Sequence, residues 1–248
     1  MMERPTRVVT AKLAAKVGCA VAVAAIGAGV VLSSDGGTSR VPPPPGTPGT
    51  TTLAAVRNSA PGYASPGGRP AGTIPASVFG RPSVLPVLAT RPGWIRVRLP
   101  ERPNGSTAWL PASDVVLRST PYRIVINLAS TRLSLYLRGR LVLSAPAGVG
   151  VPDDPTPTGK FFVQFDEPPP QPDPGYGPFV IVTSAHSPTI SDWEGSGDAL
   201  MGIHGPLGDS KQIGVTGARV SHGCIRLQVQ ALELLRQVPA GTPVDVIG

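Results

Sequence analysis

The fold class of this sequence is decided by one stretch, Arg132-Leu133-Ser134-Leu135-Tyr136-Leu137-Arg138-Gly139-Arg140-Leu141-Val142-Leu143-Ser144. Apolar and polar residues alternate over residues 132–137, which is the period of a half-buried strand. The Arg-Gly-Arg that follows predicts a turn, and the next apolar run returns as a second strand. Further runs with strand character lie at residues 123–127, 160–165 and 242–246. The C-terminal half, residues 121–248, is therefore predicted to be mainly β.

Helical signals are few. One short helix is expected near the end of the chain, because Ala231, Leu232, Leu235 and Val238 keep helical spacing and Pro239 follows them. The 248 residues include 31 prolines and 30 glycines, and only 5% are aromatic. This composition favours many turns and at least one unstructured stretch.

Residues 53–120 predict a second, smaller β module. Turn signals such as Arg91-Pro92-Gly93 separate short apolar runs, and Trp94-Ile95-Arg96-Val97-Arg98-Leu99 alternates as a half-buried strand does. With Trp94 and Trp109 each beside a turn, the spacing resembles bacterial SH3-like domains, which are small β-barrels often joined to wall enzymes. Two interpretations stay open, a packing module and a direct binder of wall ligands.

The first 52 residues carry an export signal and a spacer. A basic flank precedes the apolar run Val17 to Leu32, so residues 1–34 are predicted to be a signal peptide or a signal anchor, with a single-pass anchor slightly favoured. Residues 35–52 are rich in Pro, Gly, Ser and Thr and predict a semi-rigid linker. We therefore expect an exported protein that acts on the wall side of the cytoplasmic membrane, either anchored or secreted.

The formal net charge is +7, but its distribution argues against a nucleic-acid partner. Outside the N-terminal flank the basic residues are scattered singly, and no basic run is interleaved with aromatic residues. Mild, dispersed positive charge suits an anionic envelope surface better.

Chemistry is concentrated in two glycine-rich motifs, Met201-Gly202-Ile203-His204-Gly205-Pro206 and Ser221-His222-Gly223-Cys224-Ile225-Arg226-Leu227. Cys19 lies in the apolar N-terminal run, so Cys224 is the lone thiol of the folded part. A free thiol is mostly protonated at neutral pH, and an adjacent imidazole can take that proton to give a nucleophilic thiolate. Glycines beside Cys224 permit backbone N–H groups to face a developing oxyanion.

Two other interpretations of these motifs are weaker. Cys224 with His204 and His222 could hold zinc, but Gly223 makes a regular strand doubtful, and Asp198 and Asp209 flank the motifs only loosely. A structural buried cysteine would not call for two glycine-flanked histidines. The third histidine, His186, is expected to be a solvated loop residue, or else part of a cleft wall.

The combination of His204 with Ser221-His222-Gly223-Cys224 resembles the L,D-transpeptidase family with its YkuD-type catalytic domain. The resemblance covers residues 121–248 and implies a YkuD-type β-sandwich or barrel-like domain. It implies Cys224 as nucleophile and His204 as general base, with the Gly205 carbonyl orienting the imidazole.

The same resemblance implies roles around this pair. His222 and Gly223 shape the site, with the Gly223 and Cys224 amides in the oxyanion hole, and Ser221 holds the loop. Arg226 either binds a carboxylate of the donor peptide or braces the loop. Tyr176 lies where the family has a lid-like connection over the cleft and is a candidate substrate contact.

The implied reaction needs no cofactor and no metal. Cys224 would attack the L,D-amide of one peptidoglycan stem peptide, and the thioester would pass to an amine of a second stem, giving a 3→3 cross-link. The resemblance also implies carbapenem-type β-lactams as covalent inhibitors. Three alternatives stay open: an L,D-carboxypeptidase with the same site, a non-catalytic wall-binding protein, and transfer to a protein acceptor.

Overall fold

The computed structural model describes residues 49–169, 173–193 and 195–248. The predicted signal segment at residues 1–34, with Cys19, and residues 35–48 of the predicted linker lie outside the described residues. No helix in the described part of the chain is long and apolar enough to cross a membrane.

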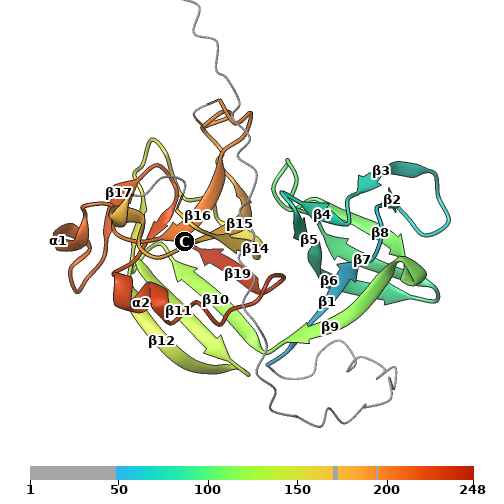
Figure 1. Ribbon diagram of the computed structural model, residues 1–248, viewed down its shortest axis with the longest axis horizontal. Helices are drawn as coiled ribbons and strands as arrows, with labels where there is room; N and C mark the ends of the chain where they lie inside the picture. Colours follow the sequence, from blue (N-terminus) through green and yellow to red (C-terminus); the bar gives the residue numbers. More distant parts are fainter. Residues whose placement is uncertain (1–48, 170–172, 194) are drawn as a thin grey trace, which may run out of the picture. The chain divides into compact units, whose positions relative to one another are not determined.

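The described residues are mainly β, as predicted, and Figure 1 shows the order of the strands. The elements along the chain are β1 (Thr51–Val56), β2 (Ala60–Tyr63), β3 (Pro70–Ile74), β4 (Ser77–Val78), β5 (Arg81–Pro82), β6 (Val84–Arg91), β7 (Trp94–Arg98), β8 (Thr107–Pro111), a 3-10 helix (Ala112–Asp114), β9 (Val115–Thr120), β10 (Tyr122–Asn127), β11 (Arg132–Leu137), β12 (Arg140–Pro146), β13 (Gly148–Gly150), β14 (Gly159–Glu167), a 3-10 helix (Pro174–Tyr176), β15 (Val180–His186), β16 (Leu200–His204), α1 (Ser210–Ile213), β17 (Ala218–Ser221), β18 (Ile225–Arg226), α2 (Val229–Glu233) and β19 (Pro243–Ile247).

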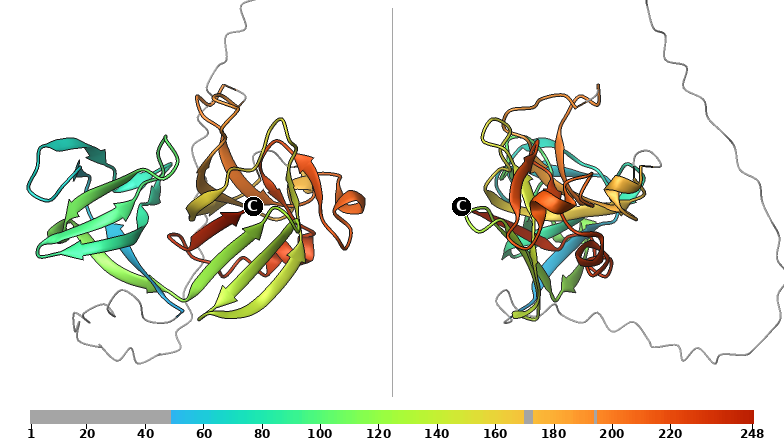
Figure 2. Two further views of the ribbon diagram at one scale, coloured as in Figure 1. Left: turned by 180° about the vertical axis from the view of Figure 1, so that it is seen from behind. Right: turned by 90° about the vertical axis from the view of Figure 1, so that its left-hand side faces the viewer.

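The C-terminal module, residues 121–248, contains a ten-stranded sheet in the order β12-β11-β10-β19-β14-β15-β16-β18-β13-β17. The hairpin predicted at residues 132–144 is β11 and β12, which pair antiparallel. The last strand, β19, lies between β10 and β14 and pairs parallel with β10, as the dark red arrow beside the yellow-green arrows shows (Figures 1 and 2). The last strand therefore joins β10, with the β11–β12 hairpin beside it, to the other part of the sheet.

Helices are short in this module, and one was not predicted. The expected C-terminal helix is α2, although it spans only Val229–Glu233 before the chain continues in turns. The expectation of a single helix is corrected by α1, which spans Ser210–Ile213. A four-residue helix is too short to show a helical period in the sequence.

The N-terminal module, residues 49–120, contains a seven-stranded antiparallel sheet in the order β3-β2-β8-β7-β6-β1-β9 and the separate β4–β5 hairpin. Its first strand begins at Thr51, inside the predicted linker. Side chains alternate between the two faces of each strand, and apolar ones such as Leu85, Val97 and Leu110 point into one core. The likeness to SH3-like domains stays a prediction.

Strand β14 contributes to two cores at once. Successive side chains of a strand point to opposite faces. Phe161 and Val163 therefore pack in the core of the C-terminal module, while Phe162, only 1% exposed, packs in the core of the N-terminal module. Gly241 also lies against the N-terminal module, since a Cβ there would meet side-chain atoms of Leu53 and Val84 at 2.9 Å. The packing of the two modules is thus continuous through β14.

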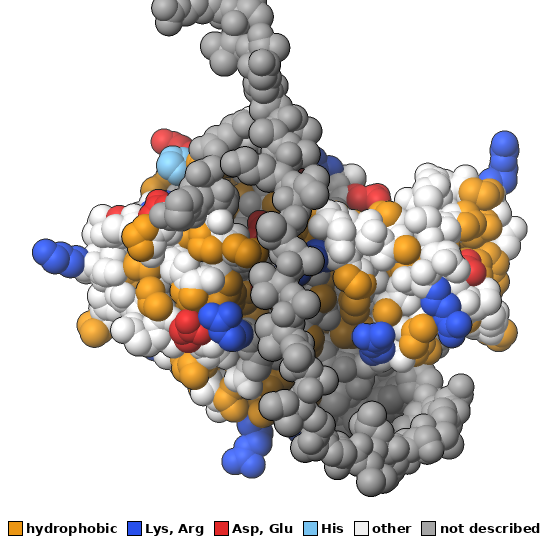
Figure 3. All heavy atoms as spheres, in the orientation of Figure 1, with side chains coloured by type: hydrophobic (Ala, Val, Ile, Leu, Met, Phe, Trp, Pro, Cys, Tyr) orange, Lys and Arg blue, Asp and Glu red, His pale blue; other side chains and the backbone are white. Residues whose placement is uncertain are grey.

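Figure 3 shows how charged and hydrophobic side chains are distributed over one face of the molecule. Lys and Arg side chains stand apart from one another there, and hydrophobic side chains gather between them.

Candidate active site

Two neighbouring parallel strands bring the glycine-rich motifs together. Strand β16 ends at His204, and β18 begins directly after Cys224, with Ile203 opposite Ile225 in the register. The Gly202 N–H donates to Cys224 Sγ at 3.4 Å. A Cβ on Gly202 would lie 3.8 Å from Cδ2 of the His204 ring. The thiol and the imidazole therefore both lie beside Gly202.

The imidazole of His204 has a defined orientation. Its Nδ1 lies 2.8 Å from the Gly205 carbonyl oxygen, and because a carbonyl only accepts, Nδ1 carries the proton. The lone pair is then on Nε2, the atom bonded to Cδ2. The Tyr176 ring lies 4.8 Å from the imidazole, centroid to centroid, and the Tyr176 carbonyl accepts from the Gly205 N–H at 2.7 Å. The sequence-predicted Gly205 and Tyr176 thus both hold His204.

Burial makes both candidate catalytic groups uncharged at rest. Burial lowers the pKa of His204 to about 4, against the hydrogen bond to Gly205 and with the positive charge of Arg226 acting in the same direction as burial. Burial also raises the pKa of the Cys224 thiol, although the Gly202 N–H and Arg226 favour the thiolate. A neutral imidazole beside a neutral thiol suits general-base activation during attack rather than a stable ion pair.

The loop before Cys224 is held by its own side chains. The Ser221 hydroxyl donates to the Cys224 carbonyl at 2.6 Å, and its Oγ accepts from the Gly223 N–H at 3.1 Å. Gly223 has φ +115 and lies so close to Met201 Sδ that a Cβ would collide with it. Ser221 makes the local bonds that the sequence predicts.

The predicted oxyanion hole needs one correction. The Gly223 amide already donates to Ser221 Oγ, so in this structure it does not face the cavity as a free donor. Among the described residues, no hydrogen-bond acceptor is found for the Cys224 N–H. The Cys224 amide is therefore the better candidate of the two.

His222 does not join His204 in the cavity that Cys224 lines. Its side chain is 58% exposed, with Nε2 3.9 Å from Asp154 Oδ2 and its ring 5.7 Å from the Trp193 ring. No group of three His, Cys, Asp or Glu side chains in the described ranges is arranged to hold a metal ion.

Arg226 has a partner within the chain. Its Nη1 contacts Asp209 Oδ2, and the two side chains are only 14% and 17% exposed. Of the two roles that the sequence left open, this ion pair favours bracing of the loop over capture of a donor carboxylate. Asp209 was noted in the sequence only as a residue that loosely flanks the motifs, because nothing local indicates its partner.

One cavity of about 550 Å³ contains both His204 and Cys224. Its walls are largely aromatic and aliphatic, with Phe165, Tyr176, Trp193 and, from the N-terminal module, Phe79. Phe79 and Trp193 were not predicted as site residues, since each lies in a turn with no motif around it.

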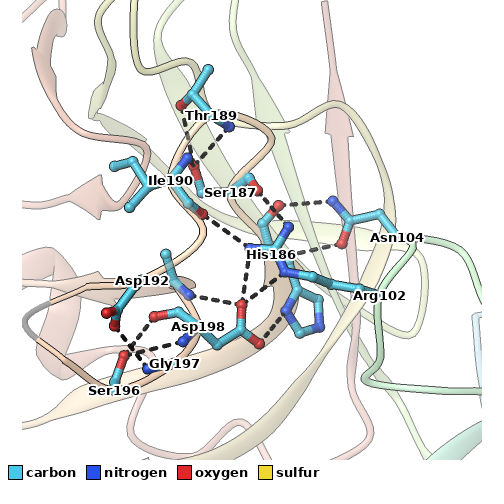
Figure 4. A network of polar contacts seen from close by, with 11 residues as sticks. Arg102, Asn104, His186, Ser187, Thr189, Ile190, Asp192, Ser196, Gly197 and Asp198 are labelled. Carbon is cyan, nitrogen blue, oxygen red and sulfur yellow. Dashed lines mark hydrogen bonds and ion pairs between the residues drawn. The ribbon is translucent and has the colours of Figure 1, made fainter.

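A network between the modules holds the segment that carries Trp193 (Figure 4). The Arg102 guanidinium donates to Asp198 Oδ1 at 2.9 Å, to the Ser187 carbonyl at 2.9 Å and to the Ile190 carbonyl at 3.0 Å. Asn104 exchanges two hydrogen bonds with the backbone of His186, at 2.8 and 2.9 Å. Both donors come from one turn of the N-terminal module.

His186 is buried in this network, contrary to the expectation of a solvated loop residue. It ends strand β15, is 3% exposed, and its Nδ1 lies 2.7 Å from Asp198 Oδ2. In Figure 4 the Asp198 carboxylate lies between the Arg102 guanidinium and the His186 ring. Burial alone raises the pKa of Asp198, but the hydrogen bonds from Ala199 N–H and Arg102 and the charge of His186 outweigh it and hold that pKa below its usual range.

Comparisons with known proteins give a consistent result. The family model of the YkuD L,D-transpeptidase catalytic domain matches residues 121–246. A Bacillus licheniformis protein assigned as the L,D-transpeptidase YkuD is 38% identical over 127 residues, and the corresponding Bacillus subtilis protein is 32% identical. Each alignment covers 51% of this chain and 66% of the relative, so the chain spans slightly less than two thirds of these relatives.

Solved structures are more distant. An L,D-transpeptidase from Mycobacterium smegmatis is 20% identical, with 62% of this chain and 91% of that chain covered and a TM-score of 0.39. The catalytic domain of the E. faecium L,D-transpeptidase is 26% identical, with 51% and 96% covered and a TM-score of 0.37.

A mainly β module thus carries a thiol and an imidazole on the wall of one cavity. The family model covers half of the chain, and the chain belongs to the YkuD L,D-transpeptidase catalytic domain family.

Proposed function

We propose that this protein is a peptidoglycan L,D-transpeptidase in which Cys224 is the nucleophile and His204 the general base. The observation that carries the proposal is the convergence of both side chains on Gly202 within one cavity. The Nδ1 proton of His204 is held by the Gly205 carbonyl, so Nε2 is the atom that can take a proton.

The first half-reaction breaks an amide. As Cys224 Sγ attacks the L,D-amide carbonyl carbon of a donor stem tetrapeptide, the thiol proton passes to His204 Nε2. The carbonyl oxygen becomes an oxyanion, for which the Cys224 N–H is a candidate donor. The C–N bond then breaks, and Nε2 returns the proton to the leaving amine of the terminal D-residue. The product is a thioester on Cys224.

The second half-reaction makes an amide. The side-chain amine of a second stem's diamino acid attacks the thioester carbonyl and loses a proton to His204 Nε2. The Cys224 sulfur leaves and regains that proton, and the new bond is a 3→3 cross-link. If water attacks in place of the amine, the product is a free tripeptide, and the enzyme is an L,D-carboxypeptidase.

Product analysis tests the proposal. Purified protein incubated with tetrapeptide stems should yield cross-linked dimers, whereas tripeptides alone would indicate the carboxypeptidase. Cys224→Ser should lower turnover by about 10³-fold or more, since nucleophile substitutions in enzymes of this kind have very large effects. The exposed Ser113→Ala is the matched control and should leave turnover unchanged. Equal turnover in Cys224→Ser would contradict the assignment.

Acylation by β-lactams gives an independent readout. A carbapenem carries a strained amide that a cavity thiolate can open, so intact-protein mass should increase by one inhibitor molecule. The increase should be absent in Cys224→Ser. A mass increase that persists in that variant would place the reactive group elsewhere.

The proposed site of action is the wall side of the cytoplasmic membrane. The basic flank and apolar run within residues 1–34 and the Pro-rich linker at 35–52 support export. A fusion of residues 1–52 to a phosphatase that is active only outside the cytoplasm should be active in a bacterial host, and an inactive fusion would contradict export.

A further inference from the structure

The turn of the β4–β5 hairpin contains Phe79, a residue that is unusual for the backbone conformation found there. Val78 pairs with Arg81, so Phe79 and Gly80 form a two-residue turn, and their φ values are +49 and +73. A two-residue turn with positive φ at both positions is typical of type I′, for which Asn-Gly is the preferred sequence. A bulky residue with positive φ is strained. Turn formation therefore does not explain Phe79.

Folding does not explain the ring of Phe79 either. The side chain is 77% exposed and makes one edge-to-face contact, with Phe165 at 5.9 Å between ring centroids. The ring forms part of the wall of the cavity that contains His204 and Cys224. Phe165 belongs to a small apolar cluster with Val180 and Val182, which line the same cavity. An occupant of the cavity would cover the exposed face of Phe79.

The N-terminal module also acts on Trp193, another aromatic residue of the cavity wall. Trp193 is 44% exposed, and its backbone N–H donates to the Asp198 backbone carbonyl at 2.9 Å. The Asp198 carboxylate is in turn held by Arg102. One turn of the N-terminal module thus fixes the backbone that presents Trp193.

We propose that the N-terminal module is a working part of the substrate site, in which Phe79 contacts the stem peptide and Arg102 positions the Trp193 wall. This rests on the proposed function, because the occupant is the substrate of Cys224. Aromatic rings at a cavity mouth pack well against the methyl and methylene groups of such a peptide. Phe79 is a specificity-determining residue, and Arg102 is a positioning residue.

Substitutions of Phe79 separate substrate contact from structure. Phe79→Asn restores the preferred turn sequence, so Tm should stay equal or rise, while KM for the stem peptide should rise about fivefold, the loss expected for one aromatic contact. Alkylation of Cys224 by iodoacetamide should be unchanged, since that small reagent does not reach Phe79. Val116→Ala, a change at another exposed apolar residue of the module, is the control and should leave KM unchanged.

Binding distinguishes failure of this proposal from failure of the proposed function. The affinity of a tetrapeptide stem for Cys224→Ala is measured by calorimetry with and without Phe79→Asn, so no turnover is needed. A fivefold weaker affinity supports the Phe79 contact even if the wild type makes no cross-links. An unchanged affinity and an unchanged KM overturn it.

The positioning role of Arg102 is tested by measuring how rigid the backbone around Trp193 is when Arg102 is replaced. Arg102→Met should speed amide exchange at Trp193 and Ala199, and it should raise KM more than it lowers kcat. Arg102→Lys should behave more like the wild type, because a lysine can still pair with Asp198. Arg96→Met is the control, because Arg96 donates to Thr107 within the module. Unchanged exchange and KM in Arg102→Met, or an equal loss in Arg96→Met, would overturn the positioning role.

Discussion

The two buried histidines stand near opposite ends of the β15–β16 pair and have opposite surroundings. His204 ends β16, and its Nδ1–H donates a hydrogen bond to the carbonyl of Gly205. His186 ends β15, opposite Leu200, and its Nδ1 lies beside the carboxylate of Asp198. His204 lines one cavity with Cys224, whereas His186 is absent from that cavity wall and is buried in the network with Asp198. Since both side chains are almost fully buried, access to the Cys224 thiol, more than burial, distinguishes the candidate base from the structural histidine.

The largest difference between the two histidines is expected when each is replaced by glutamine. His204→Gln should lower kcat for stem-peptide turnover by about 10²- to 10⁴-fold, the usual range for loss of a general base. His186→Gln, the matched variant, should change kcat by less than about tenfold while lowering Tm. Steady-state kinetics and thermal unfolding on both variants provide the measurement. A larger kcat loss in His186→Gln would reverse the assignment.

The pH dependence of stability should sharpen the same contrast. The pKa of His204 falls from an ordinary 6.5 to about 4 on folding, so between these values the unfolded chain binds the proton more readily. Above about pH 6.5 the imidazole is neutral in both states and does not change the free energy of unfolding. As the pH drops to about 4, the free energy of unfolding should fall by roughly 3 kcal/mol. Urea unfolding of wild type and His204→Gln across this range should show a flatter profile in the variant. Parallel profiles would contradict the burial of His204.

The smallest expected effect concerns the network around His186. Asp198→Asn keeps the shape of the side chain but removes the charge that Arg102 and His186 share, and the cost should be about 1 kcal/mol because the carboxylate is partly exposed. Chemical denaturation gives the value, with the half-buried Asp114→Asn as control. Equal stability of Asp198→Asn and wild type would show that the network adds nothing to the fold.

Much of the fold was predictable because its signals are local. The alternation at residues 132–137 matches β11 at both ends, and the predicted strand at 160–165 lies within β14. The four-residue α1 was missed because it is shorter than the period that would indicate it. Strand order was not predictable, since β19 joins β10 and β14 through contacts between distant residues.

The candidate site divides in the same way. Cys224, His204 and Ser221 could be singled out because glycine-rich motifs surround them, and the side chains of His204 and Ser221 bond to residues close to them in the sequence. The burial of His186 was predicted wrongly because its partners Asn104 and Asp198 come from other segments of the chain. Phe79, Arg102 and Trp193 have no motif around them, so only the fold indicates their place beside the cavity.

The sharing of Phe162 between two cores has a practical consequence for making the protein. A fragment cut at the family boundary, residue 121, would keep β14 but lose the side chains that cover Phe162. The bared aromatic surface would favour self-association of the excised piece. Expression trials with truncated chains should therefore carry Phe162→Ser or Phe162→Thr, or else retain everything from Thr51 onward.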